Sequence, residues 1–218
     1  ILRRKLAAAE ADIRGLDWEL TMAGLVTDDP EYRDADAAVE TLKAGGQYDL
    51  IVLCVAGWIP THAVIRVIER FRHIPMLVWG LCGWKQRNRL MTTADQAGTA
   101  GLCFTMGELG FRYDFVYSVV DRPAPVDRID AFGRAAMTVQ RMRDIRIGTM
   151  GYRDMLLYGT MFDGMSLRRI IGPEVEPFEM LEIVRAAGEV DPERVESIVE
   201  HCKTHWEFQR PVQTDLLR

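Results

Sequence analysis

Trp58 and Trp84 are two residues whose type and place in the sequence suggest contact with a ligand. Each follows an apolar segment that is typical of a buried strand, and each has a glycine directly before it. An indole ring at the end of a strand can stack on the apolar face of a sugar or of another flat ligand. The same ring can instead pack over the sheet edge or into a subunit interface, and from the residues alone packing is the favoured interpretation. Both tryptophans are candidates for substrate binding.

A third candidate segment is residues 148–154, where two glycines flank the end of an apolar stretch. It lacks both the GxGxxG pattern of a dinucleotide site and the lysine of a P-loop, so it indicates nucleotide binding only weakly. Tyr152 and Arg153 add a hydroxyl and a planar guanidinium at the end of the predicted strand, which suits contact with a polar ligand. These two residues are also candidates for substrate binding.

His201 and His205 have the i, i+4 spacing that lets two side chains bind one metal ion from the same helical face. A third ligand at a recognisable spacing and the glutamate of an HExxH motif are both missing, so solvated or interface histidines are the favoured interpretation. The sequence also lacks a GxSxG elbow, a cysteine–histidine motif and a convincing carboxylate pair. We therefore predict no catalytic residue and no metal ligand from these patterns.

Composition and charge limit the classes of function. The chain has 218 residues, of which 48% are apolar, and a net charge of −5. A mildly acidic chain without a basic block argues against nucleic acid or an anionic membrane as the partner. The longest apolar run, residues 50–59, is about half as long as a membrane-spanning helix needs to be. The four cysteines form no CxxC pair, which predicts reduced thiols and a cytoplasmic location.

The elements that must position the candidate residues alternate between helix and strand. Residues 48–56 and 76–79 are apolar without alternation, which is typical of strands covered on both faces. Further strands are expected at 18–26, 113–119, 146–150 and 174–178, helices at 2–13, 34–44, 60–71, 94–110, 127–143, 166–171 and 192–208, and a loop at 80–92. This alternation predicts an α/β fold with a doubly wound (Rossmann-like) parallel sheet, whose ligands bind beyond the carboxyl ends of the strands.

The order of the elements predicts two domains. A boundary near Asp144 separates an N-terminal α/β domain, residues 1–144, from part of a second α/β domain, residues 145–218. The chain begins inside a helical pattern. The second array has only two predicted strands, which are too few for a doubly wound domain.

Several segments follow, in order, the pattern of a known family. The pattern has a strand that ends in Trp, a Trp-Gly-x-x-Gly loop and a strand with an Ile-Gly-x-x-(Gly/Ser) turn. An Asp then leads into a short helix with a Leu-Gly or Ile-Gly stop, followed by a strand containing Val and an Asp/Glu-Met/Leu-x-Glu turn. The matching segments are residues 55–58, 78–83, 146–153, 162–172 and 174–183. On these motifs the chain resembles the L-fucose/L-arabinose isomerase family, and within it the fucose isomerase-like branch.

The resemblance implies a ketol isomerase that interconverts an aldose and a ketose. In the family a divalent ion, usually Mn²⁺, holds the oxygens at C1 and C2 of the open-chain sugar, while acidic side chains move a proton between these carbons through an ene-diolate. The resemblance implies that the metal ligands lie beyond the equivalent of Arg218 and that the first strand of the sheet precedes Ile1. The subunits form homo-oligomers, typically hexamers, in which an N-terminal domain closes the active site of its neighbour. We therefore expect an N-terminal portion of such an enzyme, inactive alone.

Residue by residue, the resemblance matches Trp58 to the family's sugar-stacking Trp, donated across the subunit interface. Tyr152 falls where the family has an apolar substrate-lining residue, often Met, and is a departure from the pattern. The loop of Trp84 lies near the same substrate mouth. The alternative hypothesis is a stand-alone sugar-binding module of the periplasmic-binding-protein type, because pairs of doubly wound domains also build such proteins. A reading frame that continues past Arg218 would favour the isomerase.

Overall fold

A computed structural model describes residues 1–151 and 153–217 of the chain. These residues form two compact units, Ile1–Arg141 (unit 1) and Met142–Arg218 (unit 2). The boundary between the units lies close to the predicted one at 144/145. Each unit is described by itself below.

Unit 1 contains a parallel sheet of three strands, β1 (Ile51–Val55), β2 (Met76–Gly80) and β5 (Tyr113–Tyr117), in the order β1-β2-β5. The predicted α/β class is therefore confirmed, and the sheet flanked by helices is compatible with a Rossmann-like domain. In the register of the ladder, the last residues of the strands lie side by side, Val55 beside Gly80 and Gly80 beside Tyr117. The three strands thus end in one row at a single edge of the sheet.

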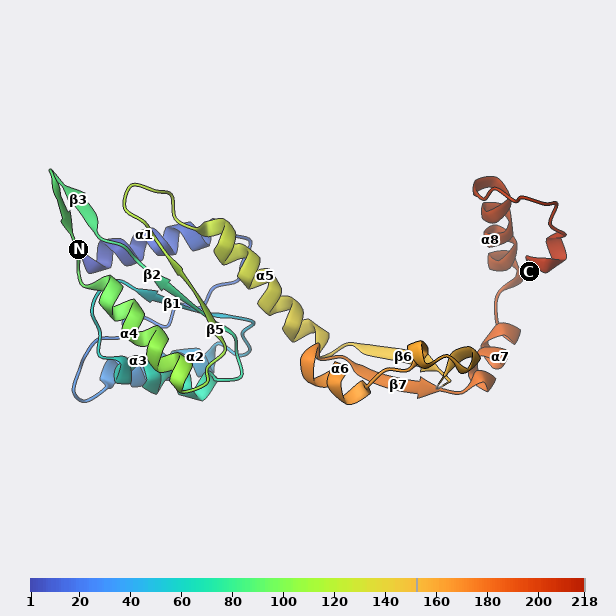
Figure 1. Cartoon of the computed structure of the whole chain (residues 1–218), viewed down its shortest axis with the longest axis horizontal. Coiled ribbons are helices and arrows are strands. Elements are labelled where there is room, and N and C mark those ends of the chain that lie inside the picture. The colour runs from blue at the N-terminus through green and yellow to red at the C-terminus, as the bar shows by residue number, and fades with distance from the viewer. Residues whose placement is uncertain (152, 218) are drawn as a thin grey trace. The chain divides into compact units, whose positions relative to one another are not determined.

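Helices cover both faces of this sheet, as Figure 1 shows. One face carries α2 (Arg33–Ala44), α3 (Thr61–Ile68) and α4 (Asp95–Glu108), and the other carries α1 (Leu2–Arg14) and α5 (Val126–Met142). All five helices match predicted ones to within a few residues. Since β2 is central and covered on both faces, every one of its residues is buried, as its uniformly apolar sequence predicts.

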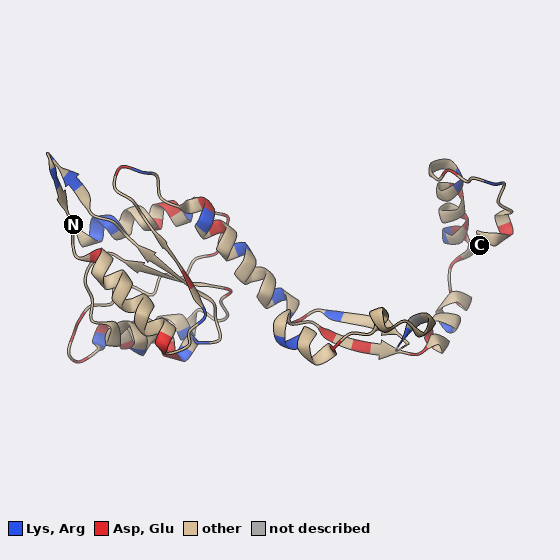
Figure 2. Ribbon diagram, in the orientation of Figure 1, with Lys and Arg blue, Asp and Glu red and all other residues tan. Residues whose placement is uncertain are grey.

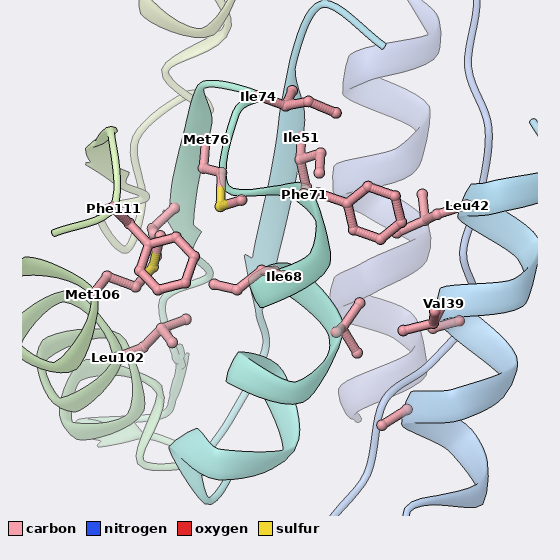
Figure 3. Packing of buried hydrophobic residues seen from close by; sticks show 14 of the residues in the cluster. Val39, Leu42, Ile51, Ile68, Phe71, Ile74, Met76, Leu102, Met106 and Phe111 are labelled. Atoms are coloured by element: carbon pink, nitrogen blue, oxygen red, sulfur yellow. The ribbon is translucent and has the colours of Figure 1, made fainter. Parts of the chain in front are cut away.

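Two hydrophobic clusters fill the space on either side of the sheet. Figure 3 shows the first, in which Ile68 of α3 lies between side chains from α2 and from α4. Met76 of β2 and Met106 of α4 are fully buried within it. The second cluster lies on the opposite face, where Trp79 of β2 packs with Ile129 of α5 and with residues of α1. Together these clusters hold unit 1 around its sheet.

Residues 18–26 do not form the predicted strand but run as an irregular segment outside the sheet. Trp18 packs in the cluster beneath α1 and α5, with its ring against Gly133, whereas Ala23 and Val26 pack in the cluster on the opposite face. The apolar residues are thus used to join the two cores. An edge strand would also direct side chains to both faces, so the apolar pattern does not distinguish a paired strand from this unpaired segment, and the predicted strand was wrong.

Residues 80–92 were expected to be a loop, but they include an antiparallel hairpin of β3 (Trp84–Gln86) and β4 (Arg89–Met91). Its turn has Arg87 at a φ of 56°, a backbone conformation that hairpin turns require and that glycine or asparagine usually supplies. The strands are short and the turn lacks the usual glycine, so the sequence carries no strong hairpin pattern. In Figure 1 the hairpin projects away from the sheet of unit 1.

Unit 2 contains a parallel pair of strands, β6 (Arg146–Met150) and β7 (Glu174–Phe178), in the predicted positions. Helix α6 (Gly164–Ile170) lies between them in sequence and packs on β7. Two further helices follow, α7 (Met180–Gly188), which was not predicted, and α8 (Pro192–His205). The expected cap of the last helix is present, since the Asp191 carboxylate accepts a hydrogen bond from the N–H of Glu193.

Short 3₁₀ turns complete the described elements. They are Glu69–Phe71, Asp154–Leu156, Tyr158–Thr160 and Thr214–Leu216. Figure 2 shows that the Lys and Arg positions and the Asp and Glu positions are scattered along both units. Over residues 1–151 and 153–217, none of the helices combines the length and the apolar character needed to span a bilayer.

Candidate functional site

The candidate site lies at the carboxyl edge of the unit 1 sheet, where the three strands end at Val55, Gly80 and Tyr117. Ligands of open parallel α/β sheets bind in this position, because the loops that follow the strands are free to vary while the strands hold them in place. The loop after β1 carries Trp58, and the segment after β2 carries Trp84. The fold thus brings both predicted tryptophans to the same edge of one sheet.

Trp58 combines a hydrogen-bonded backbone with an exposed side chain. Its N–H donates a hydrogen bond of 2.9 Å to the carbonyl oxygen of Thr93. The preceding residue, Gly57, lies so close to α4 that a Cβ on Gly98 would be 2.6 Å from the Gly57 carbonyl oxygen. The residue is 65% exposed. This arrangement fixes the backbone of Trp58 at the sheet edge and leaves its side chain accessible for stacking.

Trp84 opens the β3–β4 hairpin and is half-buried. It pairs with Met91 across the base of the hairpin, and the chain then continues to Thr93, the residue that binds the backbone of Trp58. The adjacent Lys85 forms an ion pair with Asp121, which follows β5. The hairpin is therefore connected to the loops after both neighbouring strands.

A buried polar cluster lies beneath these loops and was not predicted from the sequence. Its centre is Asp95, the first residue of α4, whose side chain is buried. The Asp95 carboxylate accepts hydrogen bonds from the hydroxyl of Thr92 at 2.9 Å and from the hydroxyl of Tyr117. Lys5 of α1 approaches the same carboxylate at 3.3 Å. A buried charge is thereby paired and hydrogen-bonded, as it must be to avoid a large desolvation cost.

The pKa values of this cluster argue for a structural role. Burial raises the pKa of the Asp95 carboxyl, but hydrogen bonds from Tyr117 and Thr92 and the charge of Lys5 outweigh this effect and lower the pKa to about 2. Burial and the bond to Asp95 raise the pKa of the Tyr117 hydroxyl. Burial likewise raises the pKa of the nearby Cys82 thiol, which makes it a poor nucleophile. Neither Asp95 nor Tyr117 is thus poised to exchange a proton near neutral pH.

Arg153 belongs to unit 2, where it follows β6. Its guanidinium lies 4.2 Å from the centroid of the Tyr158 ring and donates a hydrogen bond to the carbonyl oxygen of Leu156. Tyr152, the other predicted substrate-binding residue of this segment, lies outside the described residues. The structure therefore groups Trp58 with Trp84, whereas Arg153 stands in a separate unit.

The two histidines of α8 are engaged with each other. The rings of His201 and His205 are stacked with centroids 4.2 Å apart, and Nδ1 of His205 lies 3.0 Å from the carbonyl oxygen of His201. In the described part of the chain, no three side chains of His, Cys, Asp or Glu come together as a set of metal ligands. The described residues do not by themselves fit a bound Mn²⁺ ion.

Comparison with known proteins adds no assignment: neither a protein-family model nor a curated protein sequence matches the chain. The candidate site therefore rests on the geometry of unit 1 and on the motifs in the sequence.

Sequence reasoning found the two tryptophans but missed Lys5, Thr93 and Asp95. One signal was present, because the run Thr92-Thr93-Ala94-Asp95 has the hydroxyl and acidic residues typical of a helix start. Lys5 lies next to apolar positions in the sequence of α1. Nothing in that pattern indicates that its ammonium group binds residues near the start of α4. The pairing becomes visible only when the fold places α1 over the ends of β1 and β2.

Proposed function

We propose that this chain is part of a cytoplasmic aldose–ketose isomerase that acts on an L-fucose- or L-arabinose-like sugar. In this proposal the chain supplies an aromatic contact to the sugar and contributes to the interface of a homo-oligomer. The observation that carries the proposal is the exposed Trp58 ring, held on a fixed backbone at the carboxyl edge of the parallel sheet. The motifs shared with the fucose isomerase-like branch support the choice of reaction.

The physical basis is stacking between a flat ring and the apolar side of a sugar. A sugar presents C–H groups on one side and hydroxyls on its rim. An aromatic surface can therefore bind the C–H groups while the hydroxyls stay hydrated. A ring on a mobile loop would lose conformational entropy on binding, whereas the bonds around Trp58 limit that loss in advance. An exposed indole in this setting is better explained by a ligand or a neighbouring subunit than by packing within unit 1.

The proposal assigns no step of proton transfer to the described side chains. In isomerases of this type the metal polarises the sugar oxygens, but the described residues of this chain contain no set of metal ligands. In this proposal Trp58 and Trp84 orient the sugar, and Arg153 contacts a polar group of the substrate.

The direct test is the conversion of L-fucose or L-arabinose to the ketose by the protein that contains this chain, with Mn²⁺ present. We expect Trp58→Ala to lower kcat/KM about tenfold through loss of stacking, and Trp58→Phe to retain most of the activity. Trp206→Ala is the matched control, since Trp206 is a similarly exposed tryptophan in unit 2. Absence of interconversion, or equal activity of Trp58→Ala and the wild type, would overturn the proposal.

A sugar-binding module is the alternative function, since an exposed aromatic ring at the carboxyl edge of a parallel sheet also suits binding alone. Such a module binds a sugar without chemical conversion. Calorimetric titration of L-fucose and L-arabinose distinguishes the two functions. Binding that depends on Trp58 without any conversion would support the module, and conversion would support the isomerase.

A further inference from the structure

We propose that Lys5 and Asp95 are positioning residues that hold Trp58 in the orientation required for contact with a sugar. The identity of the ligand rests on the proposed function, but the positioning itself does not. Both side chains are largely buried, and both act through Thr93 and through the backbone that carries Trp58. Three sets of contacts at the ends of β1 and β2 confine this backbone.

The first set is made by the ammonium group of Lys5. Its Nζ donates hydrogen bonds to the carbonyl oxygen of Ala56 at 2.8 Å, to the hydroxyl of Thr93 at 2.9 Å and to the carboxylate of Asp95 at 3.3 Å. These acceptors come from the loop after β1, from the segment after β4 and from the start of α4. A single side chain of α1 thus joins the loop after β1 to the segment that leads into α4, two parts of the chain that lie far apart in the sequence.

The second set centres on Thr93. Its hydroxyl donates to the carbonyl oxygen of Ala56 at 2.5 Å, and its own carbonyl oxygen accepts the N–H of Trp58 at 2.9 Å. The backbone on both sides of Gly57 is therefore bound to one residue. Asp95 in turn fixes Thr93, since its carboxylate accepts the Thr93 N–H at 3.3 Å.

The third set is steric. A Cβ at Gly57 would lie 3.0 Å from a methyl group of Leu2 and 3.1 Å from the carbonyl oxygen of Thr93. On the other side, the backbone of α4 at Gly98 lies against the Gly57 carbonyl. The loop that carries Trp58 is thus confined by α1, by Thr93 and by α4. Only the indole extends out of this enclosure.

Loss of Lys5 should release this loop. Without the ammonium, Asp95 would be a buried carboxylate lacking its cation, and such a group draws in water or moves toward solvent. Either response displaces Thr93 and with it the backbone of Trp58. Displacement of a contact group by about 1 Å is enough to lower binding or rate substantially, which makes the cluster a determinant of ligand affinity.

Fluorine NMR of the chain labelled with 5-fluorotryptophan tests the positioning directly. The five tryptophans give separate signals, and Trp58→Phe identifies the signal of Trp58. We expect Lys5→Met to shift or broaden the Trp58 signal while the signal of Trp206 in unit 2 stays unchanged. Arg14→Met is the control on the same helix, because it removes only the exposed ion pair with Glu10. An unchanged Trp58 signal in folded Lys5→Met overturns the proposal.

A second pair of variants tests the proposal if Lys5→Met does not fold. Thr93→Val removes the hydroxyl that binds Ala56 and keeps the side-chain shape, whereas Thr93→Ser keeps the hydroxyl. We expect Thr93→Val to move the Trp58 signal and Thr93→Ser to leave it near the wild-type position. Equal signals in both variants overturn the proposal.

The ligand arm uses L-fucose and L-arabinose as probes and follows the same fluorine signals. We expect the dissociation constant of the bound sugar to be about tenfold higher in Thr93→Val than in Thr93→Ser. A Trp58 signal that moves in Thr93→Val while neither sugar binds the wild type supports the positioning and counts against the proposed function. Sugar binding with equal affinity in both variants overturns the positioning and leaves the proposed function intact.

Discussion

Strand β2 of unit 1 and strand β6 of unit 2 have the same length and both lie in parallel sheets, but they differ greatly in burial. Every residue of β2 is buried, whereas all residues of β6 except Thr149 are exposed. The difference comes from the surroundings, because β2 has strands on both sides and helices on both faces, and β6 has one neighbouring strand. Burial of a parallel strand is thus a property of the layers around it as much as of its own sequence.

The apolar side chains of unit 2 show the same difference. Leu181 and Val184 of α7, Met165 of α6 and Phe178 of β7 are all exposed, while the two clusters of unit 1 enclose residues of similar type. Side chains that stay in water on folding contribute little to the free energy of unfolding. Single substitutions should therefore matter far more in unit 1 than in unit 2.

The largest expected effect is the loss of a core side chain. Leu77→Ala empties space in the fully buried centre of β2 and should lower the free energy of unfolding of unit 1 by about 2–5 kcal/mol. The matched change in unit 2 is Leu181→Ala, where the side chain is 74% exposed and the effect should stay within about 0.5 kcal/mol. Urea unfolding of both variants measures the two losses of unfolding free energy. Similar losses would show that unit 2 buries α7 in solution.

The next effect comes from a close approach of two backbones. Gly98→Ala would place a methyl group 2.6 Å from the carbonyl oxygen of Gly57, which neither backbone can relieve cheaply. We expect a loss of about 3 kcal/mol in unfolding free energy. Gly101→Ala on the same helix is the control, since its Cβ meets open space and alanine favours a helix, so it should be neutral or stabilising. Equal unfolding midpoints for the two variants would contradict the tight packing of α4 against the Trp58 loop.

The smallest expected effect is the pH dependence that Asp95 gives to unit 1. The pKa of its carboxyl is about 2 in the folded chain, against 3.8 for an unperturbed aspartate. The charged form therefore stabilises the fold by about 2 kcal/mol above pH 4, and this stabilisation is lost as the pH falls from about 4 to 2. Urea unfolding followed by tryptophan fluorescence, to which the buried Trp79 contributes, should show this loss in the wild type.

Two variants isolate the contribution of Asp95 from that of other carboxyls. Asp95→Asn should be less stable at pH 6 and should show a shallower loss of stability between pH 4 and 2. Asp36→Asn removes an exposed ion pair with Arg66 and should leave the pH profile almost unchanged. An identical profile for Asp95→Asn and the wild type would mean that the Asp95 pKa is not lowered.

Sequence patterns predicted the structure correctly where the residues of one helix or strand determine the structure of that element. The apolar run of β2 and the inward positions Ala35, Ala38, Val39 and Leu42 of α2 were predicted and are all buried. They failed at residues 18–26, whose apolar character suits a strand but serves packing in two cores. They also missed α7, because its residues Met180–Gly188 directly follow β7 without a side-chain cap.

In the candidate site, too, one part could be predicted from the sequence and another part could not. The place of Trp58 after a buried strand was readable from the sequence, because parallel strands end at one edge of a sheet. The partners of its backbone were not, since the hydrogen bonds from Lys5 to Ala56 and Thr93 join distant parts of the chain. Long-range polar contacts carry no periodicity, so they leave no pattern in the sequence.

The β3–β4 hairpin leaves the sheet and returns to it at nearly the same point, closed at its base by the pairing of Trp84 with Met91. Its residues beyond that base, Lys85–Leu90, are exposed and pack in neither core. Residues inserted at the Arg87–Asn88 turn would lengthen the hairpin without disturbing the path from β2 to α4. The hairpin is therefore a place where evolution or design can remodel the rim of the site while the scaffold stays constant.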